Sequence, residues 1–453
     1  MSQLPTFALY IHWPWCKAKC PYCDFNSHEG LIQEEAYVEG LLAEMEQWRI
    51  GRTLHEHAIP PFTPATRRLG SIFFGGGTPS LMSAESLSRI VQKCRQLGTV
   101  DDATEVTVEC NPTSFGDKRP AEIFFQELKA AGVNRVSIGI QGLKSEWLSF
   151  LGRTHRVDEA LATLDAAQAV FGNVNADVIY GLPGQQLEDW NALLRNLAGR
   201  GLAHISAYQL TIEQNTRFFK DVRKGLWEPI NSDLEADFFD ATRETLRGFG
   251  YDNYEISNFA QPGMACRHNV HIWNYGEYLG IGAGAHGRVM TPHGMPVATQ
   301  IVKQPDGYLR RMNDLGDAIS VAAPLNGPEA VQEAVFSGLR LTTGVDMEIL
   351  LKRFGEASCK EALNVPEIDF LISRGLLDAN GSGESLSETS LERYFSTSGR
   401  HTRFLRLSDA GWPKLNSVLE RVLRALPDNS PHHATLPASS PSEYKSGVTV
   451  LIE

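Results

Sequence analysis

The sequence has no apolar stretch long enough to cross a membrane. A transmembrane helix needs about 20 mainly apolar residues, and no uninterrupted apolar run of about 18 occurs in this chain of 453 residues. The first residues, Met1 to Pro5, also lack the basic flank, apolar core and cleavage site of a secretory signal. We therefore expect a cytosolic (cytoplasmic) protein without a membrane span.

The chain also lacks an excess of positive charge. Its 42 Lys and Arg residues against 54 Asp and Glu residues give a net charge of −12. This sign opposes broad attraction to phosphate backbones and anionic lipids. We therefore expect no nucleic-acid partner.

Cysteine is scarce, and its number is odd. Three of the seven cysteines, Cys16, Cys20 and Cys23, lie within eight residues, and the others are scattered. This pattern argues against a disulfide framework and is typical of a metal or iron–sulfur site. Cys94 and Cys359 fall on predicted helices and are interpreted as small buried apolar residues. Cys110 and Cys266 remain unassigned.

Short β-branched or aromatic runs alternate with amphipathic segments up to about residue 250. The predicted strands are Phe7–His12, Ser71–Phe74, Glu105–Glu109, Arg135–Ile140, Asn175–Ile179 and His204–Leu210. The predicted helices are Glu34–Gln47, Ala84–Gln96, Ala121–Ala131, Val157–Val170, Leu187–Leu197 and Leu234–Arg247. Six βα units predict an α/β fold, a partial (β/α)6 barrel with a parallel sheet.

The alternation ends near residue 250, which suggests a division into parts. We expect a barrel over 1–250, an extension of loops and short strands over 251–325, a small, mostly helical, winged-helix-like domain over 326–425, and a disordered tail over 426–453. The last predicted helix is Ala410–Leu423. The Pro-rich stretch 51–68 has no periodic pattern and is expected to be a surface loop.

The three clustered cysteines follow the first predicted strand, where α/β proteins place their sites. A [4Fe–4S] cluster held by three thiolates leaves one iron open to another ligand. The spacing also suits zinc, with His28 or His12 as the fourth ligand. Unligated thiols are the third interpretation, so the triplet alone leaves the kind of site open.

A glycine run follows the second predicted strand, at Gly75, Gly76 and Gly77, before Thr78. Glycines without side chains let the backbone approach a ligand closely. No Lys follows, so the run is not a P-loop. Taken alone, three glycines favour a plain turn over a ligand-binding loop.

Together, these motifs resemble the radical S-adenosylmethionine (SAM) superfamily, and within it the heme-chaperone branch of the coproporphyrinogen III oxidase-like group. The resemblance spans residues 5–290. It rests on Tyr10 to Phe25 around the cysteines, Gly75 to Ser80, Glu109-Cys-Asn-Pro112, Ser137 to Gly142 and Asp177 to Pro183. The segment from Leu407 to Trp412 is similar to the C-terminal domain of that group.

The resemblance implies a role for individual residues. Cys16, Cys20 and Cys23 would hold a [4Fe–4S] cluster, Tyr10 and Tyr22 would flank SAM, and Gly76, Gly77 and Thr78 would contact its methionine end. Glu109, Gln141, Arg153 and Asp177 would line the SAM pocket. Carboxylates suit the ammonium and ribose hydroxyls of SAM, and a guanidinium suits its carboxylate.

A second block, from Arg267 to Trp273, resembles the segment that the heme-chaperone branch associates with heme. His268, Asn269 and Trp273 match, whereas Ile272 replaces a Tyr. An imidazole is a good axial ligand of heme iron, and an indole can stack on a porphyrin. His268 is therefore the candidate heme ligand, ahead of His271 and His286, whereas the alternative is a hydrogen-bonded structural histidine, which an isolated histidine more often is.

Two functions follow from the resemblance. The first is a heme chaperone that binds heme, SAM and a [4Fe–4S] cluster and passes heme to an acceptor protein, with a respiratory protein as one candidate. Membranes would be met only through that acceptor, and a homodimer stays open. The alternative is an oxygen-independent coproporphyrinogen III oxidase. Those oxidases carry a further cysteine where this chain has Phe25, and a long segment before the cluster loop, whereas Cys16 stands near the start of this chain.

Overall fold

The structure is a computed structural model and describes residues 4–114, 119–379 and 404–426. The disordered tail expected at 426–453 lies outside the described residues from 427 onward. Among the described residues, no helix is both long and apolar enough to cross a membrane.

A curved sheet of twelve strands forms the centre of the molecule, in the order β14-β13-β12-β11-β1-β4-β5-β6-β7-β8-β10-β9. Six strands follow one another in parallel: β1 (Thr6–Trp13), β4 (Arg68–Gly76), β5 (Glu105–Cys110), β6 (Arg135–Gln141), β7 (Val174–Tyr180) and β8 (His204–Gln209). They correspond to the six predicted strands, and the partial (β/α)6 barrel is confirmed.

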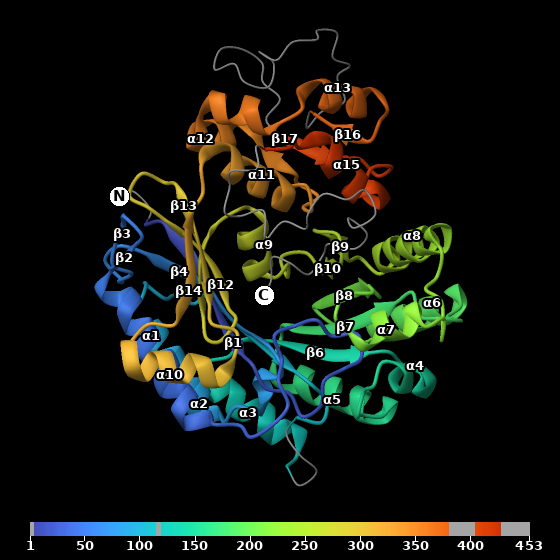
Figure 1. The fold of residues 1–453 in the computed structure, drawn as a ribbon. Helices are drawn as coiled ribbons and strands as arrows, with labels where there is room; N and C mark the ends of the chain where they lie inside the picture. Colours follow the sequence, from blue (N-terminus) through green and yellow to red (C-terminus); the bar gives the residue numbers. More distant parts are fainter. Residues whose placement is uncertain (1–3, 115–118, 380–403, 427–453) are drawn as a thin grey trace.

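The crossover helices lie on the outer side of this sheet (Figure 1). They are α1 (Glu34–Ile50), α2 (Ala84–Cys94), α3 (Ala121–Ala130), α5 (Val157–Val170), α6 (Leu187–Gly199) and α8 (Ser232–Gly248). Their apolar faces pack on the sheet, as for Leu87 and Ile90 of α2. Two shorter helices, α4 (Ser145–Phe150) and α7 (Arg217–Arg223), and the 3-10 turn η1 (Pro79–Leu81) were not predicted.

The stretch 51–68 is more ordered than the surface loop expected there. It contains a hairpin of β2 (Arg52–Leu54) and β3 (His57–Ile59). Leu54, Ile59 and Phe62 are buried in the barrel's hydrophobic core. The three apolar side chains are too widely spaced in the sequence to give a periodic pattern, which is why the prediction was wrong.

The extension after residue 250 joins the same sheet, and the expectation of loops with short strands was only partly right. It contains β9 (Asp252–Asn253), β10 (Asn258–Ala260), α9 (Arg267–Trp273), β11 (Glu277–Ile281), β12 (His286–Met290), β13 (Pro296–Ile301), α10 (Pro305–Leu315) and β14 (Ile319–Pro324). Strand β11 pairs in parallel with β1, and β12 to β14 continue the sheet antiparallel. Helix α9 lies on the inner side, against β1 and β4 (Figure 1).

The C-terminal elements are built around a second hydrophobic cluster, which also includes Phe239 of α8 and Tyr275. They are α11 (Gly327–Gly338), β15 (Val345–Asp346), α12 (Met347–Ala362), α13 (Val365–Ser373), β16 (Leu377–Asp378), β17 (Phe404–Leu407), η2 (Trp412–Lys414) and α15 (Leu415–Val422). The last α-helix begins at Leu415 instead of Ala410, because Trp412, Pro413 and Lys414 form a 3-10 turn. Helices beside a small antiparallel sheet are typical of a winged-helix-like arrangement.

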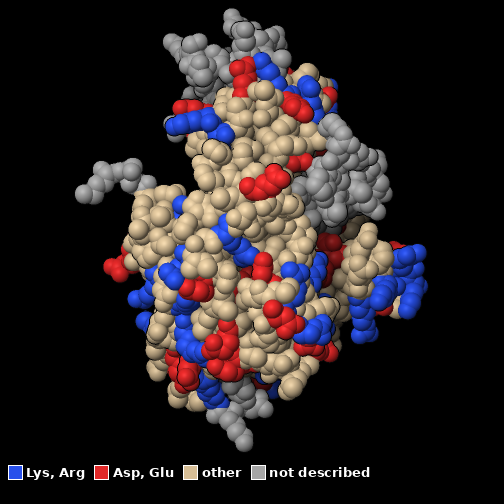
Figure 2. Space-filling view, turned by 60° about the vertical axis from the view of Figure 1, so that its left-hand side comes forward, with Lys and Arg blue, Asp and Glu red and all other residues tan. Residues whose placement is uncertain are grey.

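Acidic and basic side chains are interspersed over the barrel on the face that Figure 2 shows. On that face, basic residues do not form one broad surface.

Candidate functional site

The cysteine loop closes at the carboxyl end of β1, between β11 and β4. Its two ends are tied by backbone bonds from Cys16 N to His28 O (3.0 Å) and from His28 N to Pro14 O (2.7 Å). The loop therefore leaves and re-enters the barrel at one point. Its cysteines are free and half-buried.

Each of the three sulfur atoms has a different hydrogen-bonding neighbour. Thr78 Oγ1 donates to Cys16 Sγ (3.3 Å), Arg153 Nη1 donates to Cys20 Sγ (3.4 Å), and Ser27 Oγ lies 3.8 Å from Cys23 Sγ. Burial raises the pKa of Cys16, and it raises the pKa of Cys23 to about 12. Without a ligand, these two thiols keep their protons at neutral pH, so metal binding must displace them.

These surroundings fit a cluster held by three thiolates. Hydrogen-bond donors stabilise sulfur atoms that carry negative charge in a cluster. Within the described residues, no three His, Cys, Asp or Glu side chains are gathered closely enough to hold a metal ion, so a cluster would draw the sulfurs together. A [4Fe–4S] cluster with one open iron would supply binding of SAM and transfer of an electron to it.

The histidines considered as zinc ligands are committed to other partners. His12 Nδ1 lies 3.0 Å from Tyr10 Oη, and its Nε2 lies 2.9 Å from the carbonyl oxygen of Asn26. His28 Nε2 lies 3.1 Å from Asn26 Oδ1. A fourth zinc ligand from either residue would require these bonds to break, so the geometry favours the cluster.

A polar chain connects the cysteine loop with the ends of three strands. Asn111 Nδ2 donates to Thr78 Oγ1 (3.1 Å), and Asn111 Oδ1 accepts from Arg153. Arg153 also donates to the carbonyl oxygen of Gly139 (3.2 Å). Gln141, in a backbone conformation with φ 63°, places its amide beside Gly139 as well. The structure thus brings Thr78, Gln141 and Arg153 together with two cluster cysteines.

Asn111 belongs to this chain of contacts, although no role was predicted for it from the sequence. It lies in the Glu109-Cys-Asn-Pro112 motif, directly after β5. A short polar residue at the carboxyl end of a barrel strand was the signal that could have identified it.

Glu109 and Asp177 form an acidic pair deeper in the barrel. Burial, and then the charge of Asp177, raise the pKa of Glu109 to about 8. Burial also raises the pKa of Asp177, which accepts hydrogen bonds from Ser137 (2.9 Å) and Asn175 (2.8 Å). Two buried carboxyl groups near each other favour a cationic ligand, such as the ammonium and sulfonium groups of SAM.

The glycine run packs closely against β1 and the start of the cysteine loop. A Cβ at Gly76 would lie 2.5 Å from the His12 ring, and one at Gly77 would lie 2.5 Å from the carbonyl oxygen of Trp15. Gly77 N and Thr78 N donate to the carbonyl oxygens of Trp13 and Trp15. Side chains at Gly76 and Gly77 would therefore disturb the fold itself, before any effect on a ligand.

The two tyrosines expected to flank SAM lie in different places. Tyr10 is buried inside the barrel, and its ring stacks on Phe73 with centroids 6.3 Å apart. Tyr22 lies in the cysteine loop beside Arg153, whose charge opposes the strong rise that burial causes in the pKa of Tyr22. Only Tyr22 is therefore in direct reach of the polar chain around Arg153.

His268 lies apart from the cysteine loop, on α9. Its side chain is 0% exposed, its Nδ1 lies 2.9 Å from Ser71 Oγ, and its Nε2 has no hydrogen-bond partner among the described residues. Burial lowers the pKa of His268 to about 3, so the imidazole is neutral at pH 7. A neutral imidazole with one unpartnered nitrogen can act as a metal ligand.

Asn26 holds the cysteine loop against the loop between β11 and β12. Its Nδ2 donates to the carbonyl oxygens of Ala283 and Lys303, both at 2.9 Å. A Cβ at Gly284 would lie 2.2 Å from that same nitrogen. The sequence offered no signal for this contact, because 257 positions separate Asn26 from Ala283.

A cavity of about 720 Å³ opens beside Cys20 and Cys23. Phe150, Phe218 and Trp227 form an aromatic wall on one side of it, with ring centroids 4.7 to 5.2 Å apart. The residues expected to bind SAM on β4, β5 and β7 do not line it. It gives access to the cysteine loop from outside the barrel.

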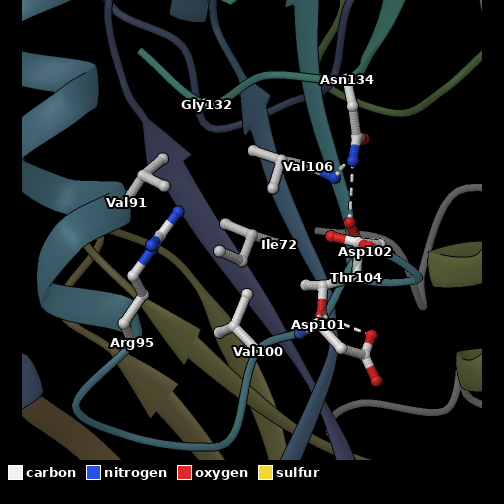
Figure 3. Close-up of a pocket in the computed structure, with 10 residues that line it drawn as sticks. All are labelled: Ile72, Val91, Arg95, Val100, Asp101, Asp102, Thr104, Val106, Gly132 and Asn134. Atoms are coloured by element: carbon white, nitrogen blue, oxygen red, sulfur yellow. Dashed lines mark hydrogen bonds between the residues drawn. The ribbon is translucent and has the colours of Figure 1, made fainter.

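A second hollow, of about 260 Å³, lies at the opposite ends of the strands (Figure 3). It is lined by Arg95 of α2, Asp101 and Asp102, and by Asn134, whose amide bonds the backbone of Thr104 and Val106. Sites of α/β barrels lie at the carboxyl ends of the strands, so this hollow has no part in the site.

Comparisons with known proteins agree with the fold. The model of the Radical SAM superfamily matches residues 10–197. The structure of coproporphyrinogen III oxidase (HemN) from Escherichia coli superposes with a TM-score of 0.70 and 20% identity, covering 92% of this chain and 90% of that one. The chain belongs to the radical SAM superfamily.

Closer relatives narrow this assignment. Radical S-adenosyl methionine domain-containing protein 1, mitochondrial, of Mus musculus is 34% identical over 438 residues, covering 95% of this chain and 90% of the mouse protein. Heme chaperone HemW of Escherichia coli (strain K12) is 38% identical over 315 residues, covering 68% of this chain and 77% of HemW. The chain is a member of the family that contains these proteins.

Proposed function

We propose that this protein is a heme chaperone that binds heme and a SAM-ligated [4Fe–4S] cluster and transfers heme to an acceptor protein. The observation that carries the proposal is the combination of a cysteine loop with one hydrogen-bonding neighbour per sulfur and 38% identity to heme chaperone HemW. Cys16, Cys20 and Cys23 hold the cluster, and SAM lies over Thr78, Glu109, Gln141, Arg153 and Asp177.

The alternative function is oxygen-independent decarboxylation of coproporphyrinogen III. The fold shared with HemN of Escherichia coli favours it. Phe25 argues against it, because Phe25 stands where such oxidases carry a further cysteine. Its side chain is 36% exposed on the cysteine loop, where it offers no ligand to a metal.

His268 is the heme ligand in this proposal. Its Nε2 is unpartnered, whereas His271 Nε2 lies 2.8 Å from the carbonyl oxygen of Glu277. Because the His268 side chain is fully buried, heme reaches it only when α9 and its neighbours separate. Binding of heme is therefore coupled to a movement of α9.

The acceptor remains to be identified, with a respiratory heme protein as the first candidate. We place this chain in the cytosol and expect it to meet membranes only through its acceptor. The mouse relative carries the word mitochondrial in its name.

Anaerobic reconstitution tests the cluster. We expect about four irons per chain, lost when Cys16, Cys20 or Cys23 is replaced by Ala, because three thiolates hold the cluster. The matched controls Cys94→Ala and Cys359→Ala change buried cysteines of the two hydrophobic clusters and should keep the iron. Zinc uptake without iron would contradict the assignment.

Titration with ferric heme tests the cargo. The reconstituted chain should bind about one heme with a Soret band that His268→Ala shifts or weakens. His293→Ala, a change at an exposed histidine, is the control. A chain that binds no heme but decarboxylates coproporphyrinogen III with SAM and a reductant would replace this proposal with the alternative.

A further inference from the structure

Arg135, the first residue of β6, is a buried cation without a direct partner. Its side chain is 2% exposed in the barrel interior. Among the described residues, its guanidinium forms no ion pair or hydrogen bond, and its Nε is buried without a partner. A guanidinium removed from water without a paired anion is strongly unfavourable, so this position needs an explanation.

The nearby carboxylates of Glu105 and Asp177 do not pair with Arg135, because they accept hydrogen bonds from other donors. Glu105 accepts from Cys266 Sγ (3.3 Å) and from the backbone N–H groups of Arg267 (3.0 Å) and His268 (3.2 Å). Asp177 accepts from Ser137 and Asn175. Burial lowers the pKa of Arg135, but the charges of groups without a direct contact, Cys266, Glu105 and Asp177 among them, outweigh burial, raise the pKa and keep the guanidinium ionised.

Arg288 is a buried arginine that does pair with a carboxylate of the same chain. Arg288 is 8% exposed, and its Nε and Nη2 donate to the two carboxylate oxygens of Glu333 at 2.9 and 2.8 Å. Such a bidentate pair is the geometry that a guanidinium prefers. Among the described residues, Arg135 has no such carboxylate partner.

The hydroxyl of Thr107 is a second unpartnered polar group, on the strand next to Arg135. It lies directly opposite Arg135 in the register of β5 and β6, and its hydroxyl is buried without a partner among the described residues. His268 lies near enough for the charge of Arg135 to lower its pKa further. A guanidinium and a hydroxyl side by side can both donate to one carboxylate.

We propose that Arg135 and Thr107 form a carboxylate site inside the barrel that anchors a propionate group of the bound tetrapyrrole. The inference rests on the heme binding proposed above. In this proposal Arg135 and Thr107 pair with the carboxylate of one propionate, and Nε2 of His268 remains for the iron. SAM also carries a carboxylate, so the test must separate the two ligands.

The test compares ferric heme with heme dimethyl ester, in which both propionates are blocked. The wild-type chain should bind the ester at least tenfold more weakly than heme. Arg135→Met should remove this preference, so that both ligands bind as weakly as the ester. Thr107→Val should reduce the preference severalfold, and neither change should alter SAM affinity measured by calorimetry.

Stability of the ligand-free chain separates a binding role from a structural one. Arg135→Met removes an unpaired buried charge, so its Tm should stay equal or rise. The comparison variant Arg288→Met strands Glu333 and should lower the Tm markedly. If Arg135→Met lowers the Tm as Arg288→Met does, Arg135 is structural and the inference is wrong.

The remaining outcomes distinguish failure of the carboxylate site from failure of the proposed heme-chaperone function. A wild-type chain that binds no heme would remove the proposed function. A wild-type chain that binds heme and its ester equally would keep that function and remove the carboxylate site. A folded Arg135→Met variant that loses SAM affinity while still preferring heme over its ester would assign Arg135 to SAM and overturn the proposal.

Discussion

At the scale of single residues, the donors around the cluster sulfurs are the most informative detail of the site. Thr78, Arg153 and Ser27 come from three different segments, and each contacts one sulfur. Hydrogen bonds to its sulfurs are one of the factors that set the potential of an iron–sulfur cluster. These residues are therefore expected to tune the cluster rather than to hold it.

We predict that Thr78→Val keeps the iron but lowers the reduction potential of the cluster. The lost hydroxyl stabilised negative charge on Cys16, and the shift should be on the order of tens of millivolts. Redox titration followed by EPR measures it. Thr99→Val, a change at an exposed threonine, is the control. An unchanged potential in Thr78→Val would contradict this role.

We predict that Glu109→Gln changes how stability depends on pH. The pKa of Glu109 in the fold is about 8, above the value of about 4.3 for an exposed glutamate. Between these values the folded chain binds the extra proton, so its stability falls as the pH rises. The Gln variant does not titrate, and its free energy of unfolding relative to wild type should rise by about 4 kcal/mol from pH 5 to pH 9.

Urea unfolding of the SAM-free chain at several pH values measures this difference. Parallel profiles for the two proteins would mean that Glu109 is already ionised at neutral pH. The two buried carboxyl groups would then not be coupled as the structure indicates.

At the scale of elements, the loop between β11 and β12 supports the cysteine loop from the side. Asn26 Nδ2 donates to the carbonyl oxygen of Ala283 in this loop and to that of Lys303, which follows β13. Gly284 approaches Asn26 in a conformation with φ 88°. The closing strands of the sheet thus bear directly on the cluster site.

We predict that Gly284→Ala loosens the cluster, whereas Gly294→Ala does not. Both glycines have positive φ, but a Cβ at Gly294 meets nothing within 4 Å. Gly294→Ala should therefore cost only about 1 kcal/mol of backbone strain. Gly284→Ala should cost roughly 2 kcal/mol or more, because its methyl group displaces Asn26. Iron release to a chelator should be faster in Gly284→Ala than in Gly294→Ala or the wild-type chain. Equal release rates would contradict a role of the contact between Asn26 and this loop in holding the cluster site.

The elements of the barrel could be predicted from the sequence because each one carries its own pattern. Strands such as β6 and helices such as α2 alternate or space their apolar residues locally. Strand β11, with Gly280 in its sequence, shows no such pattern and is defined by its pairing with β1, some 270 positions earlier. Helix α10 could have been found, since Pro305 starts it and Tyr308, Leu309 and Met312 form its buried face.

The candidate site likewise contains residues that could be predicted from the sequence and residues that could not. The cysteine triplet and the glycine run are compact in sequence and could be identified there. Asn26 and Ser27 have no motif, and their contacts exist only once distant segments meet. The close packing of Gly76 on His12 is a steric fact that no spacing reveals.

At the scale of the whole molecule, a few buried polar contacts join the barrel sheet to the C-terminal elements. Glu333 of α11 accepts from Arg288 of β12 and from Tyr275 Oη (2.7 Å). The hydrophobic cluster of the C-terminal elements also includes Phe239 of α8 and Tyr275. We therefore expect the polar and the apolar contacts together to decide whether the two parts unfold as one.

We predict that Glu333→Ala lowers the free energy of unfolding by about 3–5 kcal/mol, because it leaves the buried Arg288 unpaired. The C-terminal elements should then unfold before the barrel, giving two calorimetric transitions. Glu356→Ala, which breaks an exposed pair with Lys360, should change stability by about 0.5 kcal/mol at most. A single, unshifted transition in Glu333→Ala would show that the parts are joined by other means.

The central claim, that the chain carries heme rather than making its precursor, is tested most directly by following the tetrapyrrole. The reconstituted, heme-loaded chain is mixed anaerobically with vesicles that hold a respiratory heme protein in its apo form. Heme in each fraction is then measured after separation. We predict that heme moves to the vesicles and that coproporphyrinogen III, supplied with SAM and a reductant in parallel, keeps all its carboxylates. Retention of heme together with decarboxylation of coproporphyrinogen III would contradict the account.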